Sequence, residues 1–64
     1  MTEYIVSCGP HKFFAGFVNG DPVFTTRRAG AKLFVYEEMA EHVAKRCEKV
    51  TGHKYKVECI EEEL

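Results

Sequence analysis

Two cysteine and histidine pairs are the residues whose types and spacing could hold a metal ion. Cys8 and His11 are separated by two residues, and His42 and Cys47 could supply a second pair. A structural zinc site needs four such ligands that converge on one ion. On a helix, however, His42 lies about 140° around the axis from Cys47. The sequence therefore predicts no metal site, and it predicts no bound cofactor.

A reactive thiol at Cys8 is the second chemistry to weigh. Cys8 borders the Gly9-Pro10 turn beside His11, and a histidine next to a cysteine is found in nucleophilic and redox sites. Such catalysis also needs an orienting acid and an oxyanion-binding group, and no residues are placed to supply them. Cys47 and Cys59 take inward positions of amphipathic patterns, as small buried hydrophobes do. We expect a protein that is not an enzyme.

Arg27, Arg28 and Lys32 form a local basic cluster, and the segment before them is rich in phenylalanine. Basic side chains beside aromatic rings on a sheet are the means by which proteins bind single-stranded nucleic acid. The sequence contains no ribonucleoprotein consensus, and its pI of about 6.3 is far below that of a strongly basic domain. Weak binding of single-stranded nucleic acid is therefore an alternative function.

Alternating side chains predict the strands that must position these residues. The expected strands cover residues 3–8, 12–18, 23–26 and 54–59, and residues 31–34 add a short extended segment. Asn19-Gly20 is the strongest turn signal, because both residues tolerate the positive φ of a tight hairpin. Pro22 has no N–H for a ladder, which predicts that the third strand starts there or lies at a sheet edge.

A helical period replaces this alternation at residues 36–50. The apolar side chains of this segment fall within an arc of about 140°: Tyr36, Met39, Ala40, Val43, Ala44, Cys47 and Val50. Gly52 can end the helix as a left-handed cap. We predict a single α+β domain over residues 1–60, followed by an acidic C-terminal tail at 61–64. The domain is expected to be a small antiparallel sheet of three to four strands with one amphipathic helix on one face, in the order β-β-β-α-β.

The second strand is apolar on both sides, although one helix can cover only one face of a small sheet. Strict alternation places Phe13, Ala15 and Phe17 on one face and Phe14 and Val18 on the other. One face is therefore expected to carry an exposed apolar patch that binds a second copy or another protein. Phe14 and Val18 are its expected anchors, with the basic cluster at the rim. The alternative is that residues 27–34 fold over this face.

The layout of the whole chain resembles that of short bacteriophage and prophage proteins. The segments that carry the resemblance are Tyr4-Ile5-Val6, Phe24-Thr25, Ala31-Lys32-Leu33-Phe34, Glu37-Glu38-Met39-Ala40 and Thr51-Gly52-His53-Lys54-Tyr55-Lys56-Val57-Glu58. These segments form strands, a helix start and a cap, and they carry no functional motif. The resemblance implies a protein that occupies a surface of a host enzyme or defence complex, such as an anti-CRISPR inhibitor.

Composition supports the same class of protein. The 64 residues carry a net charge of −1 and three cysteines, an odd set that forms no disulfide framework. The first residues have neither a basic region nor an apolar stretch of signal-peptide length, and no segment has the length of a membrane span. We expect a cytoplasmic, non-enzymatic interaction module that binds itself or a host protein.

Overall fold

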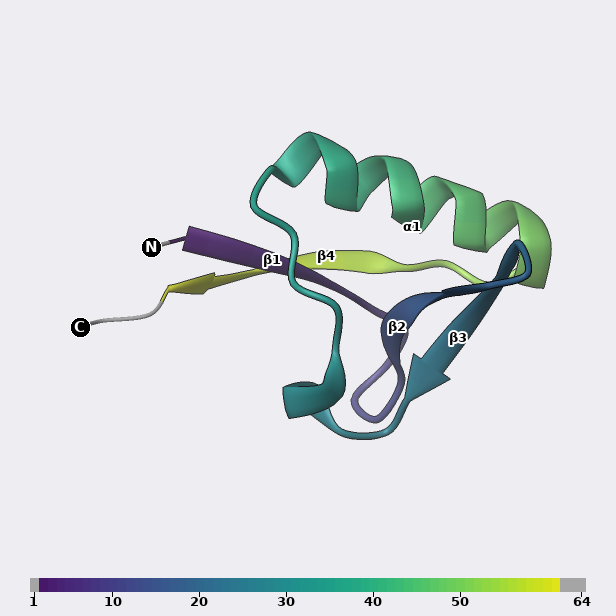
Figure 1. Ribbon diagram of the computed structural model, residues 1–64, viewed down its shortest axis with the longest axis horizontal. Coiled ribbons are helices and arrows are strands. Elements are labelled where there is room, and N and C mark those ends of the chain that lie inside the picture. The colour runs from purple at the N-terminus through teal and green to yellow at the C-terminus, as the bar shows by residue number, and fades with distance from the viewer. Residues whose placement is uncertain (1, 62–64) are drawn as a thin grey trace.

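The computed structural model describes residues 2–61 and contains a four-stranded antiparallel sheet with one helix packed on one face (Figure 1). The strand order across the sheet is β3-β2-β1-β4. The elements are β1 (Thr2–Ser7), β2 (Phe13–Val18), β3 (Asp21–Thr25), a short 3₁₀ turn η1 (Arg28–Gly30), α1 (Glu37–Thr51) and β4 (Lys56–Glu61). The predicted α+β class and element order are confirmed. Of the expected tail, Glu61 ends β4, and residues 62–64 lie outside the described residues.

The hairpin between β2 and β3 forms where the sequence predicted it. Asn19 has φ 52° and Gly20 has φ 84°, the pair of positive values that a tight hairpin turn requires. The strand that contains Pro22 lies at the edge of the sheet, so the missing N–H of this residue breaks no ladder in the interior.

The central strand β1 has two unequal neighbours. It pairs with β4 along its whole length, from Thr2 opposite Glu61 to Ser7 opposite Lys56. Its register with β2 is confined to Ser7 opposite Phe13, and β2 then turns away from β1 (Figure 1). Beside the part of β1 that β2 does not reach lies the segment before α1, which contacts β1 at Phe34.

An isolated bridge closes the gap beside β1. The Tyr4 N–H donates to the Phe34 carbonyl at 2.8 Å, and the Phe34 N–H donates to the Tyr4 carbonyl at the same distance. The Lys32 N–H donates to the Phe14 carbonyl at 2.9 Å. The short extended segment expected at 31–34 thus contributes one bridge, because its remaining residues make no ladder with β1.

A β-bulge divides β2. Phe14 pairs with Phe24, but the next pair joins Gly16 to Val23, so Ala15 is an extra residue. Gly16 has φ 148°, a conformation that side chains rarely adopt. The bulge reverses the alternation of side chains beyond Ala15.

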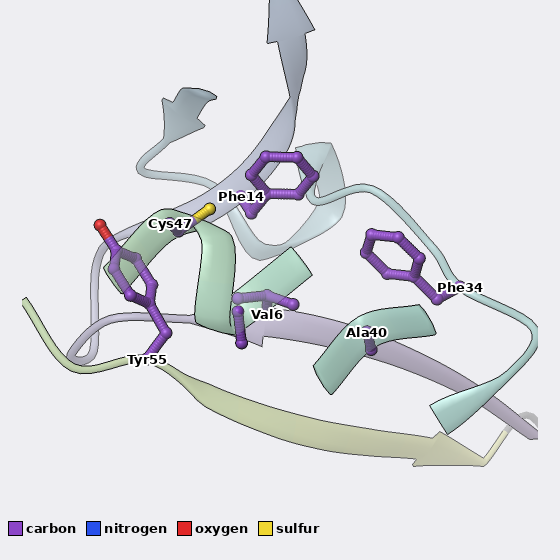
Figure 2. Close-up of a cluster of buried hydrophobic side chains, with 7 residues drawn as sticks. Val6, Phe14, Phe34, Ala40, Cys47 and Tyr55 are labelled. Atoms are coloured by element: carbon purple, nitrogen blue, oxygen red, sulfur yellow. The ribbon is translucent and has the colours of Figure 1, made fainter. Parts of the chain in front are cut away.

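The main core lies between α1 and the sheet. Ala40, Ala44 and Cys47 are the buried residues of α1. Figure 2 labels Ala40 and Cys47 with the side chains from the sheet and loops that complete this cluster: Val6, Phe14, Phe34 and Tyr55. The helix ends at Gly52, which has φ 77° and donates its N–H to the Glu48 carbonyl at 2.8 Å, so the predicted cap is confirmed.

Only part of the predicted apolar arc of α1 faces this core. Met39 is 57% exposed and Val50 is 54% exposed, and Tyr36 is also exposed. The expectation that these three residues pack inward is wrong. The buried face is centred on Ala40 and Cys47, and the divergence of β2 from β1 leaves the neighbouring side of the helix uncovered.

A second, smaller core lies on the opposite face of the sheet. Ile5 and Phe13 are buried there under Ala31, and Ile60 packs against them. The loop at 27–34 therefore covers part of the face that α1 leaves free, as the alternative interpretation of the sequence anticipated, but this face carries Phe13 and not Phe14. Within residues 2–61, no helix is long and apolar enough to cross a membrane.

Candidate functional site

Phe14, the expected anchor of an exposed sheet face, is a core residue. Its side chain is 1% exposed, stacks on Phe34 with ring centroids 6.1 Å apart, and lies against Cys47 of the helix (Figure 2). A partner protein cannot reach it in the folded chain. The prediction that Phe14 binds a partner is corrected for this reason.

Val18 keeps the exposure that the sequence predicted, at 59%. Val18 follows the bulge and comes directly after Phe17 in the strand. Its side chain therefore points to the other face of the sheet from Phe17, the face away from α1. Gly16 and Val23 are its neighbours on that face. With no large side chain at Gly16, the exposed apolar surface at this end of the hairpin is small.

The three members of the predicted basic cluster follow one another along the loop after β3, and all are exposed. The Arg27 N–H donates to the Thr25 hydroxyl at 3.2 Å, which fixes the start of η1. Arg28 forms an ion pair with Glu58, with 3.3 Å between Nη1 and Oε2. Lys32 is separated from the two arginines by the buried Ala31. Arg27 and Arg28 therefore have different surroundings, because the Arg28 side chain contacts Glu58 of β4.

The thiols and imidazoles do not converge. Among residues 2–61 no group of three or more metal-ligating side chains lies close enough to hold an ion. Cys47 is buried as expected, and this burial raises the pKa of its thiol. Cys59 is exposed, which corrects its expected burial. Its strand, β4, is at the sheet edge, and α1 does not cover the Cys59 side chain.

A hollow of about 500 Å³ lies between α1 and β4, next to Cys59. Glu37, Glu41 and Glu48 line its helix side, and Tyr4 lines its floor. Partial burial raises the pKa of Tyr4, and the nearby Cys59 and Glu37 add to the effect. The Glu48 carboxylate accepts the Tyr55 N–H at 3.4 Å, which ties the helix to the start of β4. This hollow is explained by the packing of the helix against the sheet edge.

One side of α1 carries an apolar surface that the core covers only in part, because Val43 packs against the core while Met39 and Val50 are more than half exposed. Met39, Val43 and Val50 are spaced by four and seven residues, which places them on one side of the helix. Arg46 lies on the same side, and its guanidinium lies 5.7 Å from the centroid of the Phe17 ring. Phe17 is itself 41% exposed. We call the surface made by these five residues the α1 flank. The sequence pattern assigned its three apolar helix residues, Met39, Val43 and Val50, to the core.

Apart from Glu48, the charged side chains of α1 are divided between its two ends. Glu37, Glu38 and Glu41 occupy the N-terminal half, and Lys45, Arg46 and Lys49 occupy the C-terminal half. This division suits the dipole of the helix. Glu38 and Lys49 are both exposed and, at helical spacing, project along the solvent-side edge of the α1 flank.

No family model, curated protein or solved structure matches the chain. The resemblance of the sequence to small phage and prophage proteins therefore stays a prediction, and the site is interpreted from its own geometry.

Proposed function

We propose that this protein is a protein-protein interaction module, and that the α1 flank joins it to a second copy of the same chain. The observation that supports the proposal most directly is the row of exposed apolar side chains beside the buried face of α1. Met39 and Val50 are each more than half exposed, although both belong to the apolar pattern of the helix. Monomeric proteins of this size seldom leave a continuous apolar row uncovered.

Charge complementarity favours a second copy as the partner. When two α1 helices pack in antiparallel orientation, the acidic half of each lies against the basic half of the other. With the two-fold axis level with Ala44, Met39 lies within one residue of the level of Val50 of the second copy, and Glu38 lies within one residue of the level of Lys49 of the second copy. A parallel arrangement would bring like charges together. Because a two-fold axis relates the two helices, the interface is isologous, as in most homodimers.

The size of the flank sets the expected strength of this dimer. A stable interface buries about 800 Å² on each partner, roughly a sixth of the 4879 Å² surface of this chain. Four side chains on one side of a fifteen-residue helix, together with Phe17 of β2, cover less than that. We expect an association with a dissociation constant on the order of micromolar, which corresponds to about 8 kcal/mol.

Light scattering across a concentration series under reducing conditions tests this proposal. The mass is expected to rise from the 7.3 kDa of one chain toward twice that value with increasing concentration. The variant Val50→Glu should remain at the mass of one chain, because a carboxylate would be buried against Met39 of the second copy. Circular dichroism should show that this variant keeps its fold, since Val50 is exposed in the single chain.

Val18→Glu is the matched control for this experiment. Val18 is as exposed as Val50 but lies on the opposite face of the sheet, so its substitution should leave the dimer intact. If Val18→Glu dissociates the dimer and Val50→Glu does not, the interface is the sheet face that the sequence predicted. A constant mass of one chain up to millimolar concentration would overturn self-association.

A further inference from the structure

The face of the sheet away from α1 carries a row of three paired residues. Ser7 of the central strand lies opposite Lys56 of β4 on one side and opposite Phe13 of β2 on the other. Residues paired across a sheet share one face, so their side chains stand next to one another. Phe13 is buried beside Ile5, and this places the Ser7 and Lys56 side chains on the same face.

A hollow of about 410 Å³ opens above this row. Its charged side chains come from two segments that are far apart in the sequence, namely Arg28 of η1, and Lys54, Lys56 and Glu58 at and just before the start of β4. Three of these groups are cationic and one is anionic, which leaves two positive charges around the hollow in a chain of net charge −1. Lys54, Lys56 and Glu58 alternate with inward residues, and that alternation was the sequence signal for this arrangement.

The Ser7 hydroxyl lies at the floor of the hollow. Ser7 is only 5% exposed, yet within residues 2–61 its hydroxyl takes part in none of the side-chain hydrogen bonds. Among these residues no buried side-chain oxygen or nitrogen lacks a partner, so the Ser7 hydroxyl is not sealed in the core and is open to solvent. The side of Ser7 that Lys56 and Phe13 leave free faces the hollow, so a group bound there is within reach of this donor.

Glu58 holds Arg28 over the hollow. The carboxylate accepts from Nη1 of Arg28 at 3.3 Å and 3.4 Å, so one terminal nitrogen is used and the other donors of the guanidinium remain free. A guanidinium presents its remaining donors in a planar fork that matches two oxygens of a phosphate. The ion pair thus positions a donor fork without neutralising the whole hollow.

From this geometry we propose that the hollow is a binding site for a phosphate dianion, either inorganic phosphate or the end group of a phosphate monoester. Its two excess positive charges balance the two negative charges of the ligand. Arg28, Lys54 and Lys56 contribute charged donors, and Ser7 contributes a neutral hydroxyl donor. The site lies on the sheet face away from the α1 flank, and it does not depend on the proposed dimer.

Nuclear magnetic resonance titration with inorganic phosphate at low ionic strength tests the proposal. The amide signals of Ser7, Gly9 and Lys56 should shift saturably, while signals of the α1 flank should not. In the variant Lys56→Gln the dissociation constant should rise about ten-fold, the effect of losing one charge-assisted hydrogen bond. Lys49→Gln removes the same charge from the last turn of α1 and should leave phosphate binding unchanged.

Three results would overturn the site. The first is an equal loss of binding in Lys56→Gln and Lys49→Gln, which would show that phosphate responds only to overall charge. The second is a set of shifts centred on Arg27 and Lys32 instead of Ser7. The third is a thymidine oligonucleotide without a terminal phosphate that shifts the same amides at lower concentration, because the ligand would then be a nucleic-acid phosphodiester.

Discussion

The rings of Phe14 and Phe17 lie edge to face, with centroids 4.9 Å apart, although the two residues are three positions apart in one strand. In a regular strand such residues would point to opposite faces. The extra residue Ala15 restores them to the same face, toward α1. This bulge decides which phenylalanine is buried and which extends the α1 flank.

Replacement of Phe14 by alanine is expected to be the most destabilising change in this strand. Loss of a buried phenylalanine costs about 3–5 kcal/mol, whereas a chain of this length has about 3–10 kcal/mol in total. Phe14→Ala should therefore be largely unfolded, as measured by urea denaturation followed by circular dichroism.

Phe17→Ala is the matched control, because Phe17 is the same residue type three positions away and is 41% exposed. Its free energy of unfolding should fall by less than about 1.5 kcal/mol, mainly through the lost contacts with Phe14 and Arg46. Equal losses in the two variants would contradict the assignment of faces around Ala15.

Gly16→Ala tests the bulge itself. A Cβ at Gly16 would meet no other atom within 4 Å, so any loss of stability must come from the backbone. At φ 148° an alanine is strained, and the free energy of unfolding should fall by about 1–3 kcal/mol. Gly30→Ala serves as the comparison, because Gly30 lacks a positive φ and its new Cβ would contact the movable Thr25 side chain. A larger loss of stability in Gly30→Ala than in Gly16→Ala would contradict the backbone strain expected for an alanine at the bulge.

Charge reversal tests the antiparallel pairing of two α1 helices. Glu38→Lys alone and Lys49→Glu alone should each weaken the dimer about five-fold, because exposed ion pairs contribute about 0.2–1 kcal/mol each and the two-fold axis repeats the change. An equimolar mixture of the two variants should recover the original mass-concentration curve, since opposite charges again face each other. Glu41→Lys, at helical spacing on the far side of the helix, should have no effect. A mixture no tighter than its components would rule out this orientation.

The element order and both turn signals could be predicted from the sequence, since they depend on local patterns. Alternation marked the strands, the helical period marked α1, and Asn19-Gly20 and Gly52 have the positive φ values that their residue types suggest. The sequence pattern also favoured burial of Cys47 and Tyr55, which the fold confirms.

The faces could not be predicted, because they depend on a single inserted residue. Nothing in the types of Ala15 or Gly16 distinguishes a bulge from a regular strand, although a glycine inside a strand is compatible with one. The exposure of Met39 and Val50 could not be predicted either. It follows from the divergence of β2 from β1, which no local sequence pattern records. The phosphate hollow was missed because Arg28 and Lys56 are far apart in the sequence and only the sheet brings them together.

Cys47 should make the stability of the fold depend on alkaline pH. Burial raises the pKa of its thiol above the ordinary value of 9.0, and the nearby Arg46 and Lys12 offset part of the effect. Above pH 9.0 the unfolded chain loses this proton while the folded chain retains it, so the free energy of unfolding falls as pH rises through the folded pKa. Urea denaturation at pH 8 and pH 10 with a phosphine reductant should show a smaller decrease in Cys47→Ala than in the original chain. Tyr4 titrates in both proteins and so cancels in this comparison; an identical decrease in the two would show that the Cys47 thiol does not contribute.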